Sequence, residues 1–97
     1  MFDKIKDLME MKKQADRIKR ELDAQLVECS DVKGIKITIN GSQDVKSIDL
    51  DDSLLGAGNK SRLQAELLKG INAAIRKSQM AAAAKMKSMM PGGFPGL

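Results

Sequence analysis

The stretch Ile35-Lys36-Ile37-Thr38-Ile39-Asn40-Gly41 decides the fold of this chain. Its three isoleucines alternate with polar residues, which is the pattern of a half-buried β-strand. Asn40-Gly41 then predicts a turn, because both residues tolerate a positive φ. Residues 45–50 continue as a second strand. Val45 is out of phase with the other apolar positions of that strand, so we expect a β-bulge or a turn position there.

A helical pattern precedes these strands, over residues 3–25. Its apolar positions are spaced by three and four residues in turn: Leu8, Met11, Ala15, Ile18 and Leu22. This spacing forms a narrow stripe like the a and d positions of a heptad repeat, which favours one partner helix or a sheet. Residues 26–32 are expected to add a third strand.

A second helix is expected after the flexible joint at residues 56–58. Ser61, with Gln64 three residues later, fits a capping box. Gly70 interrupts an apolar face, which suggests the close approach of another backbone. Beyond Ile75 the apolar face thins out, so we expect the helix to project from the body and to end at the Met90-Pro91 step.

These elements predict an α+β fold with the order α-β-β-β-α and a small antiparallel sheet. A chain of 97 residues forms at most one domain, here residues 1–90, followed by a flexible Pro/Gly tail at residues 91–97. A sheet of two or three strands needs a helix on its apolar face or a partner at its edge. We therefore expect an oligomer.

The charge is unevenly distributed along the chain. Residues 60–97 contain seven basic residues and one acidic residue, whereas residues 1–29 contain seven of each sign. A one-sided positive field attracts polyanions, and nucleic acid is a common one. The alternative is a solvated surface that serves solubility.

Several classes of function are disfavoured. The chain has no histidine and one cysteine, Cys29, so no nucleophile–base pair and no metal-ligand set can be named, and we expect neither catalysis nor a cofactor. Residues 56–61 lack the spacing of a phosphate-binding P-loop. No apolar run is long enough to span a membrane and no signal peptide is apparent, so we expect a cytoplasmic protein. We also expect no small-molecule substrate, since no catalytic set can be named.

Rows of cations on the two helices are the candidate DNA contacts. Phosphate contacts require cationic side chains in rows, and they require no base-specific geometry. The near absence of aromatic residues favours duplex DNA over single strands. The selected residues are Lys13, Arg17 and Arg20 on the first helix, and Lys69, Arg76, Lys77 and Lys85 on the second.

The order of motifs resembles the YbaB/EbfC family of nucleoid-associated proteins. The resemblance is carried by the Met/Gln/Lys-rich opening helix, Ile37-Thr38-Ile39-Asn40-Gly41, Ser53-Leu54-Leu55 and the leucine-led second helix. Further matches are Val45, Ile48, Leu50-Asp51, Leu63, Asn72, Ala74, Arg76, Lys85-Met86 and the Pro-Gly-Phe-containing tail. Asp52 departs from the family, in which many members have proline at that position.

The resemblance implies a homodimer in which the strands of two subunits join into one sheet and helices project like the arms of tweezers. It also implies DNA binding at the nucleoid. The rival interpretation is a prefoldin-like chaperone or protein-assembly module, which would grip its clients through arm-like helices. Charged helix tips disfavour this rival, because chaperone tips usually expose apolar surface.

Overall fold

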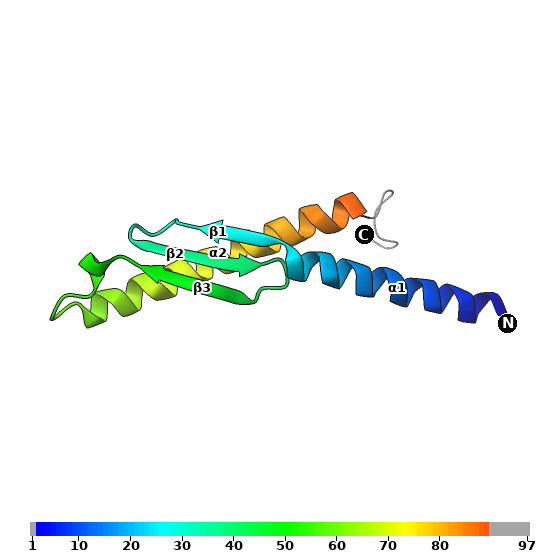
Figure 1. Cartoon of the computed structure of the whole chain (residues 1–97), viewed down its shortest axis with the longest axis horizontal. Coiled ribbons are helices and arrows are strands. Elements are labelled where there is room, and N and C mark those ends of the chain that lie inside the picture. The colour runs from blue at the N-terminus through cyan, green and yellow to red at the C-terminus, as the bar shows by residue number, and fades with distance from the viewer. Residues whose placement is uncertain (1, 90–97) are drawn as a thin grey trace.

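The computed structural model describes residues 2–89 as an elongated molecule of 67 × 19 × 17 Å. The element order is α1 (Phe2–Ala24), β1 (Leu26–Cys29), β2 (Ile35–Asn40), β3 (Val45–Leu50), a 3-10 turn η1 (Asp52–Leu54) and α2 (Lys60–Met89). Helix α1 extends beyond the body as an arm (Figure 1). The expected α-β-β-β-α order is confirmed, whereas the predicted helix end at Met90-Pro91 and the tail at 91–97 lie outside the described residues.

The three strands form an antiparallel sheet with β2 in the centre. A register shift between Thr38 and Ile39 pairs Ile39 with Val45, while Ile37 pairs with Ile48. The irregularity expected at Val45 is therefore present. It places Val45 on the same side of the sheet as Ile48, although the two are three positions apart in the sequence, an odd spacing that would place them on opposite sides of a regular strand.

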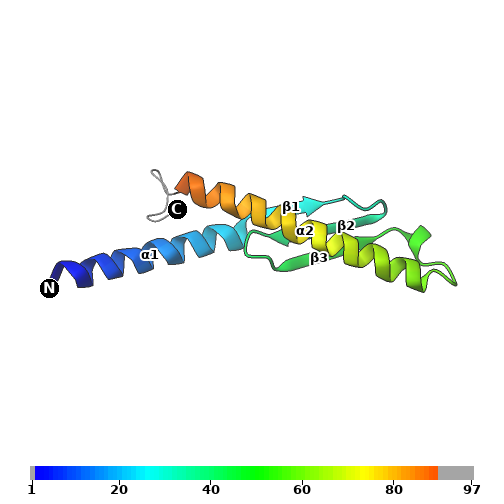
Figure 2. The same ribbon diagram turned by 180° about the vertical axis from the view of Figure 1, so that it is seen from behind.

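The core lies between the sheet and α2, which crosses one face of the sheet (Figure 2). The three isoleucines of β2 are at most 3 % exposed, and small residues of α2, Ala73 and Ala74, pack against them. Helix α2 packs mainly on β1 and β2. The edge strand β3 is consequently left open, with Val45 42 % and Ile48 44 % exposed.

The turn after β2 forms for a reason other than the predicted one. The residue with positive φ is Gln43, at 67°, and not Asn40 or Gly41. Gly41 is buried against α1, where an added Cβ would lie 3.0 Å from the carbonyl oxygen of Leu22. Glycine therefore serves the close approach of two chain segments rather than a left-handed turn.

Two details of α2 also differ from the sequence predictions. The helix begins at Lys60, and the carbonyl of Asn59 accepts the first helical hydrogen bond, from the N–H of Leu63 at 2.8 Å. Ser61 lies inside the helix, so the capping box was wrongly placed. The atoms nearest to a Cβ built on Gly70 are in side chains of the sheet, with Ile37 Cδ1 at 3.4 Å, rather than in another backbone.

Candidate nucleic-acid interface

Helix α2 carries the strongest positive charge of the molecule. Its thirty residues include seven basic side chains and one acidic side chain, Glu66. Lys69, Arg76 and Lys77 are all exposed. With a rise of about 1.5 Å per residue, the seven-residue interval between Lys69 and Arg76 corresponds to about 10 Å along the helix. These side chains can follow a phosphate backbone.

The cations of α1 lie on the face opposite its apolar stripe. Lys13, Arg17 and Arg20 are exposed. Helical periodicity turns them roughly 180° away from Leu8 and Ala15. Helix α1 also contains six acidic residues against seven basic ones, so its net field is weak. Any contact of α1 with a polyanion therefore depends on this one face.

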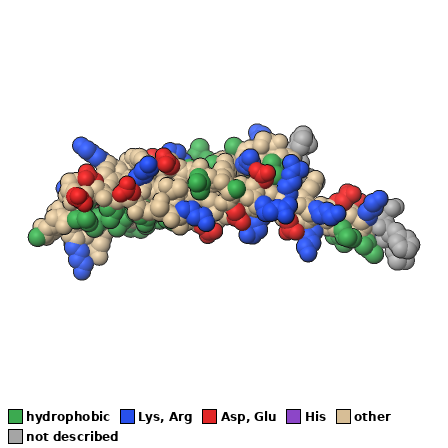
Figure 3. Space-filling view, in the orientation of Figure 1, with side chains coloured by type: hydrophobic (Ala, Val, Ile, Leu, Met, Phe, Trp, Pro, Cys, Tyr) green, Lys and Arg blue, Asp and Glu red, His purple; other side chains and the backbone are tan. Residues whose placement is uncertain are grey.

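The two helices meet where α1 leaves the body. The Nζ of Lys85 lies 3.5 Å from the carboxylate of Glu21, and Met89 lines a small groove with Arg17 and Ile18. The last turns of α2 extend past the sheet, as expected from the thinning apolar face, and they lie beside α1 (Figure 1). Figure 3 shows Lys and Arg side chains gathered around this junction.

The seven candidate DNA-contacting residues differ in whether they form an ion pair within the chain. Within residues 2–89 the ion pairs are Lys19–Asp23, Lys36–Glu28, Arg62–Glu66 and Lys85–Glu21. Of the selected residues, Lys85 alone is in one of them. The other six carry charge that no carboxylate of the described chain neutralises at short range. Lys85 contributes less net charge to the surface than its sequence position indicated.

A buried asparagine sets how the α1 arm joins the sheet and α2. The side chain of Asn40 donates to the carbonyl of Asp23 at 3.2 Å and accepts hydrogen bonds from the N–H groups of Ser42 and Asp44. The backbone carbonyl of Asn40 accepts a hydrogen bond from the hydroxyl of Ser78 at 2.6 Å. Asn40 therefore connects all the elements that carry the candidate cations. Turn propensity is the only local signal that Asn40 carries in the sequence, because its partners lie 17 and 38 residues away.

The carboxylate of Asp23 belongs to the same connection. It accepts a hydrogen bond from the Ser42 hydroxyl, and this bond lowers the pKa of Asp23 below its ordinary value of 3.8. Partial burial opposes that effect, and Lys19, at 3.3 Å, adds to the lowering. The negative charge of Asp23 is thus favoured at the base of the arm.

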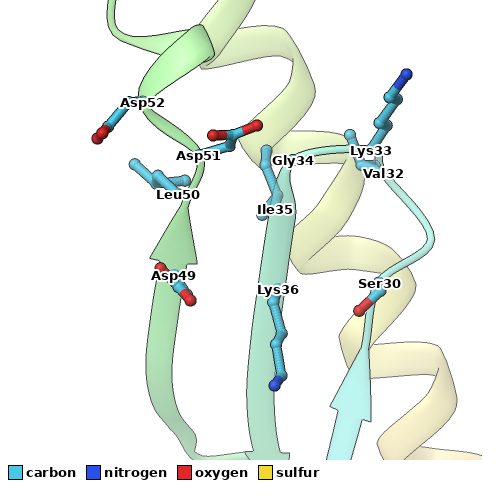
Figure 4. A pocket seen from close by; sticks show the side chains of 10 residues that line it. All are labelled: Ser30, Val32, Lys33, Gly34, Ile35, Lys36, Asp49, Leu50, Asp51 and Asp52. Carbon is cyan, nitrogen blue, oxygen red and sulfur yellow. The ribbon is translucent and has the colours of Figure 1, made fainter.

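A hollow lies at the end of the sheet that is far from the junction of α1 and α2, and it is less favourable for binding a polyanion than the cations of α2. Figure 4 shows Lys33 and Lys36 among Asp49, Asp51 and Asp52 around this hollow. The acidic side chains outnumber the basic ones, so the local field does not favour phosphate.

The described helices offer no membrane-spanning segment, because none combines sufficient length with sufficient apolar character. Within the same residues, His, Cys, Asp and Glu side chains form no group of three or more that could hold a metal ion.

The chain is similar to proteins that are named as nucleoid-associated. A protein from Chloroflexus aurantiacus named "Nucleoid-associated protein" is 34 % identical over 89 residues, which are 91 % of this chain and 88 % of that protein. A protein of the same name from Acetivibrio thermocellus is 27 % identical over 96 residues, which are 96 % of this chain and 85 % of that protein. Nothing in the comparisons supports the chaperone alternative.

A solved structure has the same fold. The crystal structure of uncharacterized protein HP0035 from Helicobacter pylori superposes with a TM-score of 0.67 at 21 % identity. The match covers 89 % of this chain and 96 % of that one. The family model of the YbaB/EbfC DNA-binding family matches residues 1–94. The chain therefore belongs to the YbaB/EbfC DNA-binding family.

Proposed function

We propose that this chain is a non-enzymatic, nucleoid-associated protein of the cytoplasm, which binds duplex DNA as a homodimer through the phosphate backbone. The observation that carries the proposal is the cation row of α2. Lys69, Arg76 and Lys77 are exposed, and none of them is in an ion pair within residues 2–89. Lys13, Arg17 and Arg20 of α1 extend this surface along the arm, and Lys85 contributes at the junction.

Backbone contact suits these side chains better than base reading. Flexible Lys and Arg side chains reach phosphates without fixed geometry, and such contacts carry no sequence information by themselves. Each phosphate that is neutralised releases counterions, so the observed affinity falls with salt at a log–log slope of about −0.9 per contact. We therefore expect steep salt dependence and weak sequence preference.

The open edge of the sheet supports the homodimer. Strand β3 has one neighbour, β2, and its residues Val45 and Ile48 leave apolar surface exposed on the side where α2 covers β1 and β2. An exposed strand edge with apolar neighbours is a template for pairing with another chain. Pairing of β3 with the β3 of a second copy would cover this edge and double the number of cation rows.

The test is a fluorescence anisotropy titration of a duplex with the wild-type protein and two charge-reversal variants. The variant Arg76→Glu/Lys77→Glu is expected to lose about 100-fold in affinity and to show a shallower salt slope. The matched control Lys33→Glu/Lys36→Glu changes the net charge equally in the acidic hollow of Figure 4. It is expected to lose less than about fivefold.

Size-exclusion chromatography with light scattering accompanies these titrations, so that loss of binding is separated from loss of the dimer. Equal losses in the two variants would mean that net charge alone drives binding and that α2 is not the contact surface. Full binding by the α2 variant would also contradict the proposal. A monomer at micromolar concentration would refute the β3 pairing.

A further inference from the structure

The stripe on α1 is mostly unused within the chain. Ile18 and Leu22, at its inner end, are partly buried, whereas Leu8 and Met11 are each 64 % exposed. Figure 3 shows hydrophobic side chains gathered on the lower side of the outer part of α1. Apolar residues at a and d spacing along an exposed arm normally face another helix.

The charges that flank the stripe identify the occupant. With Leu8 at position a and Met11 at position d, Asp7 occupies position g and Lys12 position e of the next heptad. In a parallel pair of helices, position g faces position e of the partner's next heptad. Asp7 of one copy would then lie beside the partner's Lys12, and attraction would occur twice per pair.

An antiparallel pair of the same helices would place like charges together. Position e would then face e, which brings Lys12 near the partner's Lys19, and g would face g, which brings Asp7 near the partner's Glu21. Like charges at these positions oppose pairing. Asp7 and Lys12 are both exposed, and neither is in an ion pair within residues 2–89. Both are thus available to a second copy.

We propose that the α1 stripe pairs in parallel with the α1 stripe of a second copy, so that the paired arms carry cations on two opposite outer faces and bridge two DNA duplexes. The stripe belongs to α1 and shares no residue with β3, so the two pairings use different residues of the chain, and stripe pairing joins one dimer to the next. Lys13 and Arg17 point away from the stripe in each arm. Each outer face of the pair can then contact its own duplex.

The stripe covers about two heptads, which is too short for stable pairing of dilute helices. Binding to DNA holds the chains at high local concentration, where weak contacts form. Pairing is therefore expected on DNA and not in dilute protein alone. This inference rests on the proposed DNA binding, but binding of one duplex and bridging of two are measured separately.

The bridging assay uses a biotinylated duplex on beads, saturated with protein, and a labelled second duplex of the same length in solution. The wild-type protein is expected to retain the labelled duplex. The variant Leu8→Gln/Met11→Gln keeps every charge and changes exposed side chains. Its affinity for a single duplex is expected to stay within about twofold of wild type. The amount of labelled second duplex that it retains on the beads is expected to fall at least about tenfold. Equal bridging by wild type and variant would overturn the inference.

Charge exchange tests the parallel orientation. Asp7→Lys adds positive charge, so it is expected to tighten binding to one duplex while it reduces bridging. The exchange Asp7→Lys/Lys12→Asp restores the net charge and the g–e attraction, and it is expected to recover bridging. An antiparallel pair predicts the opposite for Asp7→Lys, because the new lysine would lie near Glu21 of the other copy. Increased bridging by that single variant therefore refutes the parallel arrangement.

A disulfide provides a direct readout. Leu8→Cys on DNA under mild oxidation is expected to form a covalent pair, since equivalent a positions are adjacent in parallel helices. Glu10→Cys, on the outer face of the same helix, is the matched control and is expected to form little. The wild-type protein sets the baseline, since Cys29 is 2 % exposed. Equal crosslinking at positions 8 and 10 would mean that arms meet without the stripe, and no crosslinking at position 8 would mean that another occupant covers it.

Discussion

The two helices of this chain have similar cation spacing and opposite environments. Helix α2 buries its small residues against the sheet and carries seven basic residues with one acidic residue. Helix α1 leaves most of its apolar residues exposed, and its six acidic residues nearly balance its seven basic ones. Rows of cations alone therefore do not define a DNA surface. We expect the neighbouring acidic residues and the packing of the helix to decide which row contacts DNA.

The largest expected difference between the two regions is in how much the free energy of unfolding falls when a large apolar side chain is replaced by alanine in the body or in the arm. Ile37→Ala removes a side chain that is 1 % exposed, and the cavity is expected to lower the free energy of unfolding by about 4 kcal/mol. Leu8→Ala removes a similar side chain that is 64 % exposed, and a change within about 0.5 kcal/mol is expected. Urea denaturation measures both. A large loss for Leu8→Ala would mean that the arm is packed in solution without DNA.

Charge reversal compares the two cation rows directly. Lys13→Glu/Arg17→Glu is expected to weaken duplex binding by about tenfold, which is less than the loss expected for the α2 reversal. The reason is that the acidic residues of α1 already reduce its local potential. Anisotropy titrations at two salt concentrations check the order of the two variants. A larger loss from the α1 reversal would make the arm the main contact and would reverse the comparison.

Acidification should act on the base of the arm. The pKa of Asp23 in the folded chain lies below 3.8, so its stabilising charge is fully present above about pH 4 and is lost as the pH falls through the folded pKa. Thermal unfolding between pH 5 and pH 2 is expected to show a stability loss that Asp23→Asn reduces. The control Asp16→Asn, at an exposed position of α1 without a side-chain hydrogen bond among the described residues, should behave like wild type.

The smallest expected effect concerns the two buried glycines. Gly70→Ala should raise the free energy of unfolding by about 0.5 to 1 kcal/mol, because alanine favours a helix and the new Cβ would lie an ordinary 3.4 Å from Ile37. Gly41→Ala should instead destabilise the chain, since its Cβ would lie 2.8 Å from Gln25 Oε1 and 3.0 Å from the carbonyl oxygen of Leu22. If both variants lose stability, the space above Gly70 is smaller than the structure indicates.

The predictions from sequence succeeded where the signal is local. The alternation of Ile35, Ile37 and Ile39 gave the central strand and its buried face. The sequence predictions failed for residues whose hydrogen-bond or ion-pair partners are distant in the sequence. The role of Asn40 depends on Asp23 and Ser78, and the neutralisation of Lys85 depends on Glu21, which is 64 residues away. No periodicity carries that information.

The sequence by itself determined the order of the elements, the family and the concentration of positive charge in the second helix, because propensity, alternation and charge are properties of short segments. The tertiary structure alone decided that α2 covers β1 and β2, and that β3 and the outer stripe of α1 stay open. It also decided that, among the described residues 2–89, Lys85 has a carboxylate partner while Lys69 and Arg76 have none. These outcomes depend on how helices and sheet pack over long chain separations. Packing places side chains that no local pattern brings together.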